Sequence, residues 1–301
     1  MPPLPARTRD YVGPVTDSRV WEGFELRAGD VILSTPPKCG TTWSQAIIMM
    51  LLNGTAETER PVWNDSLWLD CGLRDQEQSV ATLNAQTTRR CIKSHTPLDG
   101  IPYHADATYI TVYRHPIDVH FSLEKHVANM VLDVLDFMYP EQEGAPFARF
   151  LTAHATDSGT DDLTLASLLY HYRSFTAWAH LPNVHFFHYA DLKRDPARAI
   201  KGYADAMGLS PSDTLIQEIA AATSFSSMKQ VTRNTQATKA RGAFKDESGF
   251  FHSATSNKWV GRLSDDEVAA YRARVEEIAQ PSEISWLENG AKAQPASSSP
   301  A

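Results

Sequence analysis

The amino-acid sequence predicts an α/β protein with a mainly parallel central sheet and helices on both of its faces. Short apolar runs, typical of buried strands, alternate along the chain with longer segments whose apolar residues recur at helical spacing. Turn residues, several of them proline, follow these runs. The 301 residues are 42% hydrophobic and 21% charged, a globular composition that excludes a disordered or fibrous chain.

Four apolar runs are the expected strands. Because strands that alternate with helices run parallel, their carboxyl ends meet at one edge of the sheet, and ligands bind there. The residues that directly follow each strand are therefore the candidates for a functional site. The expected strands are Val31–Ser34, Cys91–Ile92, Tyr109–Tyr113 and Val184–His188.

Periodicity and capping signals predict the helices. The segment Thr41–Leu52 is apolar on most sides, which indicates a buried helix. Asp195 and Pro196 form an N-cap and a first-position proline, and the apolar stripe that follows them stops at Gly208. Two further helices are expected, one at about Leu163–Trp178 and one that opens with the capping box Ser264–Glu267.

The chain shows no linker and no internal repeat, so we expect a single domain over residues 1–301. Its ordered core is expected at about 11–288, because residues 1–10 and 289–301 are rich in Pro, Ala and Ser and are expected to be loose. The three cysteines are odd in number and widely spaced, which fits neither a disulfide framework nor a zinc signature.

Charge and hydropathy exclude several classes of partner. The 28 basic and 36 acidic residues give a net charge of −8, which argues against a nucleic-acid partner. The longest apolar run, Ala46–Leu52, is far shorter than the ~20 residues of a membrane span. The N-terminus lacks the pattern of a signal peptide. We therefore expect a reduced, cytoplasmic protein with no membrane span.

The loop after the first strand, Thr35–Trp43, is the first candidate site. Gly40 allows a sharp turn, and Thr41 and Thr42 place hydroxyl and N–H groups at a helix N-terminus, which binds anions. Lys38 adds a full positive charge. The loop is P-loop-like but is not a Walker A motif, because the lysine precedes the glycine. Taken alone, the pattern also fits a plain strand–turn–helix connection with a threonine cap.

The longer string Pro37–Trp43 resembles the 5′-phosphosulfate loop of the cytosolic-type sulfotransferases, which use 3′-phosphoadenosine 5′-phosphosulfate (PAPS) as donor of a sulfuryl group. The resemblance implies that Lys38 contacts the bridging oxygen of the leaving phosphate, and that Trp43 stacks on adenine. It also implies that Cys39, where serine is commonest, binds through its backbone N–H, and that Gly40, Thr41 and Thr42 hold the 5′-phosphate.

A second segment, Lys93-Ser94-His95 after the second strand, resembles the one that carries the family's catalytic base. The resemblance implies that His95 removes the proton of the acceptor and that Lys93 supports the donor. Histidine suits this role because its ordinary pKa is close to neutrality. A lone histidine at a strand end is more often structural, and the adjacent lysine is what favours the catalytic interpretation.

Three further segments follow in the family's order, so that five motifs between residue 35 and about 259 cover most of the chain. Arg114, with Ser122 eight residues later, matches the motif for the 3′-phosphate of the donor. Tyr189 matches the tyrosine that contacts adenine. Thr223, Ser224 and Phe225 match the segment that closes over the base, and the resemblance implies cofactor-binding roles for all three.

Two family features are missing. The Arg-Lys-Gly triplet that grips the 3′-phosphate becomes His252-Ser253-Ala254 when the chain is aligned on Trp259. The common dimerisation segment is not matched either, so the oligomeric state is left open. Lys258, Arg262, Lys239 and Arg241 are the candidates to replace the charges of the triplet.

The sequence therefore predicts a PAPS-dependent sulfotransferase that acts on a small-molecule acceptor without a metal. His95 and Lys38 act directly, and Lys93 and Ser122 assist. The acceptor is expected to carry a hydroxyl or amine on an apolar or aromatic body. Apolar residues such as Trp63, Trp68, Met130, Leu135 and Phe147 would line its pocket, or equally belong to the core.

Two alternatives remain, a P-loop-like nucleotide kinase and a non-catalytic nucleotide-binding protein. The absent Gly-Lys-Ser/Thr signature speaks against the kinase, and His95 beside Lys93 has no use in a protein that only binds. We also expect the Cys39 thiol to be the most reactive of the three, because a helix N-terminus and Lys38 both favour its thiolate.

Overall fold

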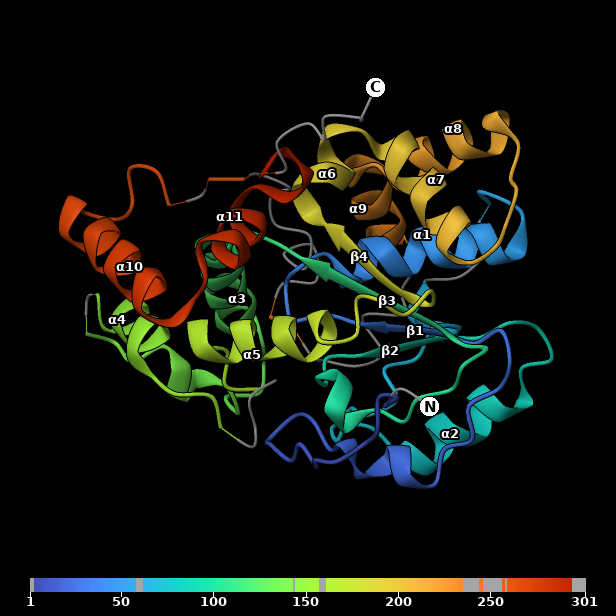
Figure 1. The fold of residues 1–301 in the computed structure, drawn as a ribbon, viewed down its shortest axis with the longest axis horizontal. Coiled ribbons are helices and arrows are strands. Elements are labelled where there is room, and N and C mark those ends of the chain that lie inside the picture. Colours follow the sequence, from blue (N-terminus) through green and yellow to red (C-terminus); the bar gives the residue numbers. More distant parts are fainter. Residues whose placement is uncertain are drawn as a thin grey trace.

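The computed structural model describes residues 3–57, 62–142, 144–156, 161–234, 244–245, 256–257 and 259–293. At its centre lies a sheet of four parallel strands in the order β2-β1-β3-β4 (Figure 1). The prediction of a mainly parallel sheet is confirmed. The strands are β1 (Val31–Ser34), β2 (Cys91–Ser94), β3 (Thr108–Tyr113) and β4 (Val184–His188).

Helices cover both faces of this sheet, which explains why all residues of β1 and β3 are buried and nearly all are apolar or hydroxyl-bearing. On one face, Val31, Leu33 and Ile110 pack against α1 and α7. On the other, Ile32, Ile92 and Tyr109 pack against Leu83 and Phe175. The first face carries α1 (Thr41–Asn53), α7 (Pro196–Ala206) and α8 (Asp213–Ala222), and the second carries α2 (Gln76–Ala85) and the end of α5 (Leu165–Thr176).

A third group of helices packs beside the carboxyl ends of the strands and builds a further part of the core, where Tyr113 and Phe150 are almost fully buried (Figure 1). It contains α3 (Pro116–Ala128), α4 (Ala145–Thr152), α10 (Asp265–Ile278) and α11 (Pro281–Asn289). Two short elements complete the described helices, α6 (Tyr189–Arg194) and α9 (Phe225–Asn234).

The capping signals in the sequence mark real helix starts. Asp195 accepts the backbone N–H of Arg198 at the start of α7, with Pro196 in its first turn. Ser264 and Glu267 form the reciprocal capping box of α10. The sequence did not predict α2, because its only buried residues are Ser79 and Leu83 and it therefore lacks an apolar stripe.

Described residues in both segments expected to be loose make contacts with the folded chain, whereas residues 1–2 and 294–301 lie outside the described residues. The backbone N–H groups of Thr8 and Arg9 donate to the carbonyl oxygen of Asp99 at 2.7 and 3.1 Å, and Pro5 is buried. Beyond α11, the N–H of Ala291 donates to the Asp191 carboxylate at 2.9 Å. Within the described residues, no helix is long and apolar enough to cross a membrane.

Candidate active site

The Thr35–Trp43 loop joins the end of β1 to the start of α1. Gly40 is the N-cap of α1 and has φ +113°, in the left-handed region that favours glycine. A Cβ at this position would also lie only 3.0 Å from Cδ2 of Tyr189. The N-cap provides no side-chain hydrogen bond, so the first N–H groups of α1 point out of the helix end toward the site. This end can bind an anion.

Hydroxyl contacts and an unusual backbone fix the loop. The Oγ1 atoms of Thr35 and Thr41 lie 2.6 Å apart, which ties the strand end to the first residue of the helix. Lys38 has φ +65°, which is uncommon for a residue with a side chain. Thr42 and Trp43 follow on α1. The side chain of Lys38 leaves the loop toward α3, where its Nζ lies 3.2 Å from Nδ1 of His126.

Cys39 contradicts the expectation of a reactive thiol. Its side chain is 0% exposed, and burial raises the pKa of the thiol to about 12, although the charge of Arg114 opposes the shift. Its backbone N–H donates to the carbonyl oxygen of Pro36 at 3.4 Å. Loss of hydration outweighs the helix N-terminus and the nearby cation, so the thiol stays protonated and enclosed.

His95 directly follows β2 and is 7% exposed. Its Nδ1 lies 2.7 Å from the carbonyl oxygen of Thr35, which can only accept. Nδ1 therefore carries the proton, and Nε2 is left with a lone pair. Burial, followed by the charge of Lys93, holds the pKa of His95 well below its ordinary value. The neutral ring has the form that a general base requires.

Lys93 and Trp68 form the next layer around His95. The Lys93 Nζ lies 4.1 Å from the centre of the Trp68 ring, a cation–π contact. The same ring meets His95 edge-on, with 4.8 Å between ring centres. Burial lowers the pKa of Lys93 to about 8. Trp68 therefore contacts both Lys93 and His95, the two expected site residues of the second motif.

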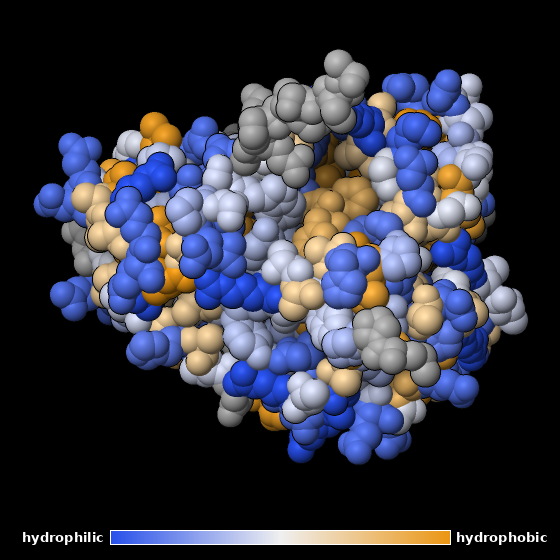
Figure 2. Space-filling view, viewed as in Figure 1, coloured by the Kyte–Doolittle hydropathy of each residue, from blue (hydrophilic) through white to orange (hydrophobic). Residues whose placement is uncertain are grey.

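A second group of expected site residues gathers around Tyr189. The Arg114 guanidinium lies 4.3 Å from the centre of the Tyr189 ring, and the Tyr189 ring meets Trp43 edge-on at 5.7 Å. Arg114 is 5% exposed, with Nη2 3.6 Å from a carboxylate oxygen of Asp118. Figure 2 shows an apolar-floored hollow in the surface over the region of β4, α6 and α9. This arrangement offers aromatic faces and a cation to a nucleotide.

The remaining expected residues are less closely gathered. Ser122 lies on α3, one helical turn after Asp118 and one before His126. Thr223, Ser224 and Phe225 lie where α8 meets α9. The Thr223 hydroxyl donates to the carbonyl oxygen of Ile219 at 2.7 Å, which stabilises the end of α8. Nucleotide-binding roles for Thr223, Ser224 and Phe225 stay predictions.

The missing triplet, His252–Ala254, lies outside the described residues, as do the substitutes Lys239, Arg241 and Lys258. Arg262 is described, and it faces elsewhere: it pairs with Glu124 at 3.0 Å and lies 4.0 Å from the centre of the Phe121 ring. The pocket that contains Arg114 also contains Arg194, at the end of α6. No sequence motif had indicated Arg194.

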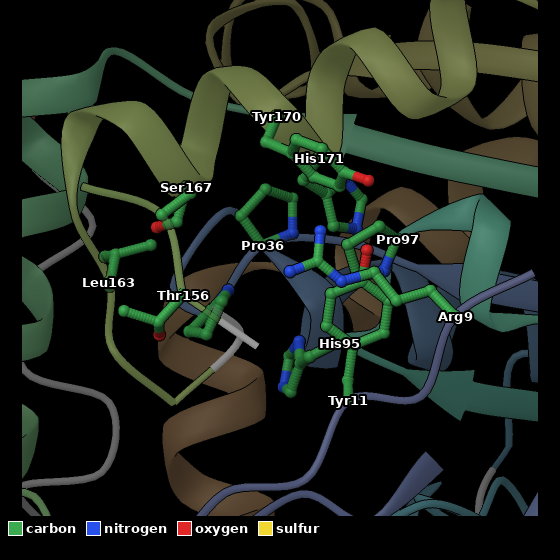
Figure 3. A pocket seen from close by; sticks show the side chains of 12 residues that line it. Arg9, Tyr11, Pro36, His95, Pro97, Thr156, Leu163, Ser167, Tyr170 and His171 are labelled. Atoms are coloured by element: carbon green, nitrogen blue, oxygen red, sulfur yellow. The ribbon is translucent and has the colours of Figure 1, made fainter. Parts of the chain in front are cut away.

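A shallow pocket opens between the loop and the N-terminal segment; its empty space of about 350 Å³ includes open solvent, and about 20 Å³ of it admits the centre of a water-sized sphere. His95 and Pro36 line it from the sheet side (Figure 3). Ser167, Tyr170 and His171 face it from α5, and Arg9 and Tyr11 enter from the N-terminal segment. Sequence patterns did not indicate Arg9, which lies in the segment 1–10 expected to be loose, or Tyr11, which belongs to none of the motifs. Leu135 and Phe147, expected as possible pocket walls, lie in the core instead.

A buried carboxylate supports the end of β2. Asp70 accepts hydrogen bonds from the hydroxyls of Ser94 and Thr96 at 2.6 and 2.7 Å, and from the indole N–H of Trp21 at 2.9 Å. These contacts hold the backbone on both sides of His95. Among the described residues, no group of three or more His, Cys, Asp or Glu side chains could hold a metal ion.

Comparisons with known families and proteins identify the family and the fold. The family model described as "Sulfotransferase domain" matches residues 28–282. The "Glycolipid sulfotransferase" of Mycobacterium tuberculosis is 29% identical over 93% of this chain and 94% of its own length. "Sulfotransferase 1E1" of Homo sapiens is 25% identical over 69% of this chain and 69% of that protein.

Solved structures share the fold. Mouse sulfotransferase SULT7A1 complexed with PAP has a TM-score of 0.69 and 20% identity, covering 91% of this chain and 92% of the other. Retinol dehydratase in complex with androsterone and the inactive cofactor PAP also has a TM-score of 0.69, at 19% identity, covering 86% of this chain and 82% of the other. At these identities the likeness concerns the fold alone.

Proposed function

Because this chain belongs to the sulfotransferase domain family, we propose that it transfers a sulfuryl group from PAPS to a hydroxyl or amine of a small acceptor. The observation that carries the proposal is the position of His95. Its Nδ1 is bound to Thr35, and it shares a pocket with Pro36 and Pro37 of the Thr35–Trp43 loop. A base and an anion-binding loop therefore line one space.

The transfer needs one base and one group that stabilises the leaving phosphate. Nε2 of His95 takes the proton of the acceptor as its oxygen or nitrogen attacks sulfur. The bond from sulfur to the bridging oxygen breaks, and its electron pair leaves on the 3′,5′-bisphosphate product, PAP. Lys38 and the N–H groups of α1 stabilise the negative charge that develops there. Placed positive charge thus lowers the barrier, together with the alignment of donor and acceptor.

The contacts around Tyr189 support PAPS as the donor. Trp43 and Tyr189 present aromatic faces suited to adenine, and Arg114 presents a guanidinium suited to the 3′-phosphate. Two relatives in complex with PAP share the fold. The pocket that contains Arg114 and Tyr189 shares no lining residue with the pocket that contains His95.

The acceptor side is mainly aromatic and apolar. Tyr11, Tyr170, Pro97 and Leu163 line the pocket, with Arg9 as its cation. An acceptor with a hydroxyl on an apolar or aromatic body fits this lining. One relative is a glycolipid sulfotransferase, and a solved structure of the same fold binds retinol or androsterone, each an alcohol on an apolar body.

The test is transfer of radiolabelled sulfate from PAPS to a panel of phenols, sterols, glycolipids and amines, with the Lys38→Met variant as control. We expect labelled product from at least one acceptor, with a rate that falls at least about a hundredfold in the variant and is insensitive to a chelator. Mg²⁺-dependent consumption of ATP, with no transfer from PAPS, would instead establish the kinase alternative.

A further inference from the structure

The ammonium group of Lys38 has a partner on another element. Its Nζ lies 3.2 Å from Nδ1 of His126, in the last turn of α3. The two residues are 88 positions apart in the sequence. Ser122 precedes His126 by one helical turn and lies on the same face of α3. One face of this helix is thus turned toward the side chain of Lys38.

The geometry sets the protonation of His126. An ammonium group can only donate, so Nδ1 accepts and the proton of the neutral ring lies on Nε2. Burial, and then the charges of Lys38, Lys93 and His95, hold the pKa of His126 well below its ordinary value. The ring of Phe244 packs on it with 5.1 Å between ring centres. His126 therefore offers a fixed acceptor at neutral pH.

We propose that His126 is the positioning residue of Lys38, holding its ammonium group where the leaving oxygen of the donor is bound. The inference rests on the proposed function. A lysine side chain has four rotatable bonds, so holding it in one conformation costs entropy. That cost raises the barrier to transfer unless the folded protein already holds the side chain in place. The ammonium has three N–H donors, so one bond to His126 leaves two for the donor.

Both ends of the lysine are then constrained. At its base the backbone has φ +65°, and at its tip the Nζ meets His126. His120 provides a matched comparison six residues earlier on α3. It is also buried and neutral, but its ring packs among Phe121, Phe147 and Phe150. If His126 acts through Lys38, the effect of replacing His126 should depend on Lys38, whereas the effect of replacing His120 should not.

The experiment measures kcat for sulfuryl transfer and the Kd of PAP by calorimetry. The variants are His126→Leu, His126→Asn and His120→Leu, each in the wild-type and the Lys38→Met background. We expect His126→Leu to lower kcat about ten- to a hundredfold while the Kd of PAP changes less than about threefold. His126→Asn should retain most of the rate, because its amide oxygen can take the place of Nδ1.

The Lys38→Met background separates positioning from stability. There, His126→Leu should change kcat by less than about twofold, because the group it positions is gone. His120→Leu should have the same effect in both backgrounds. An unchanged kcat in His126→Leu, or an equal loss with and without Lys38, overturns the inference while leaving the proposed function intact. A wild-type chain that transfers no sulfuryl group overturns both. If His126→Leu does not fold, kcat is compared between His126→Asn and His126→Gln. The Gln amide oxygen reaches the position of Nε2 instead of Nδ1, so His126→Gln should lose the rate that His126→Asn retains.

Discussion

Nδ1 of His95 lies 2.7 Å from the carbonyl oxygen of Thr35. The first residue after β1 therefore determines which ring nitrogen of His95, the first residue after β2, carries the proton. The two strands are parallel neighbours, with Ser34 paired to Ser94 at their carboxyl ends. This adjacency places the proposed base and the anion-binding loop together. It also leaves Nε2 as the ring nitrogen that can accept a proton.

The rate should depend on pH mainly through Lys93. Burial and the charge of Lys93 hold the pKa of His95 well below its ordinary value, so the base is neutral around pH 7, whereas burial lowers the pKa of Lys93 to about 8. With an alcohol acceptor that does not titrate, kcat/KM should be level near pH 7, fall to about half near pH 8 and decline further above it, as Lys93 loses its charge. Lys93→Arg should remove the fall, because arginine stays protonated. If kcat/KM of Lys93→Arg fell over the same pH range, the decline would belong to another titrating group.

Arg114 should carry most of the selectivity for the 3′-phosphate. Charge-assisted hydrogen bonds to a phosphate contribute about 1.5–3 kcal/mol, so Arg114→Ala should reduce the preference for PAP over the 5′-monophosphate at least about tenfold. Arg262→Ala is the control, because Arg262 pairs with Glu124. Calorimetry with both nucleotides measures the ratio. A preference that survives Arg114→Ala but not Arg194→Ala would give the role to Arg194.

The three thiols should react slowly in the folded protein. Cys39, Cys71 and Cys91 are all buried, and burial raises the pKa of each. With a chromogenic disulfide reagent at pH 8, we expect the absorbance of three thiols to appear only after denaturant is added. Rapid release of one equivalent before denaturation, mapped to Cys39, would show that the loop opens in solution.

Acid should destabilise the fold through buried neutral histidines. Burial lowers the pKa values of His120 and His171 to about 3, against 6.5 in the unfolded chain. As the pH falls from 6.5 toward 3, the unfolded state binds protons that the folded state does not. The free energy of unfolding should therefore fall by about 1.4 kcal/mol per pH unit for each histidine. Urea titrations of wild type and His120→Leu measure this slope, which should be smaller in the variant.

Much of this site is local in sequence, and that part could be predicted. Gly40 is required by a turn between β1 and α1, and His95 and Arg114 each directly follow a strand. Parallel pairing then brings strand ends together without further information. The four strands and the starts of α1, α7 and α10 could be predicted for the same reason, because capping and apolar periodicity act over a few residues.

The rest depends on contacts between distant segments. Nothing in the order of residues relates Lys38 to His126, and the N-terminal segment is held through the backbone carbonyl of Asp99, whose side chain accepts from Tyr11 at 2.8 Å. Cys39 was misjudged because its sequence neighbours favour a thiolate, whereas its burial depends on helices that come later in the chain. Desolvation is a property of the packed structure and has no local pattern.

The most direct test of the central claim is His95→Ala, measured for both sulfuryl transfer and binding of PAP. Because His95 acts on the acceptor, we expect the rate to fall about 100- to 10,000-fold while the Kd of PAP stays within about threefold of the wild-type value. Trp68→Phe, which keeps a ring beside His95, should retain most of the rate. Loss of PAP binding with turnover retained would contradict the account.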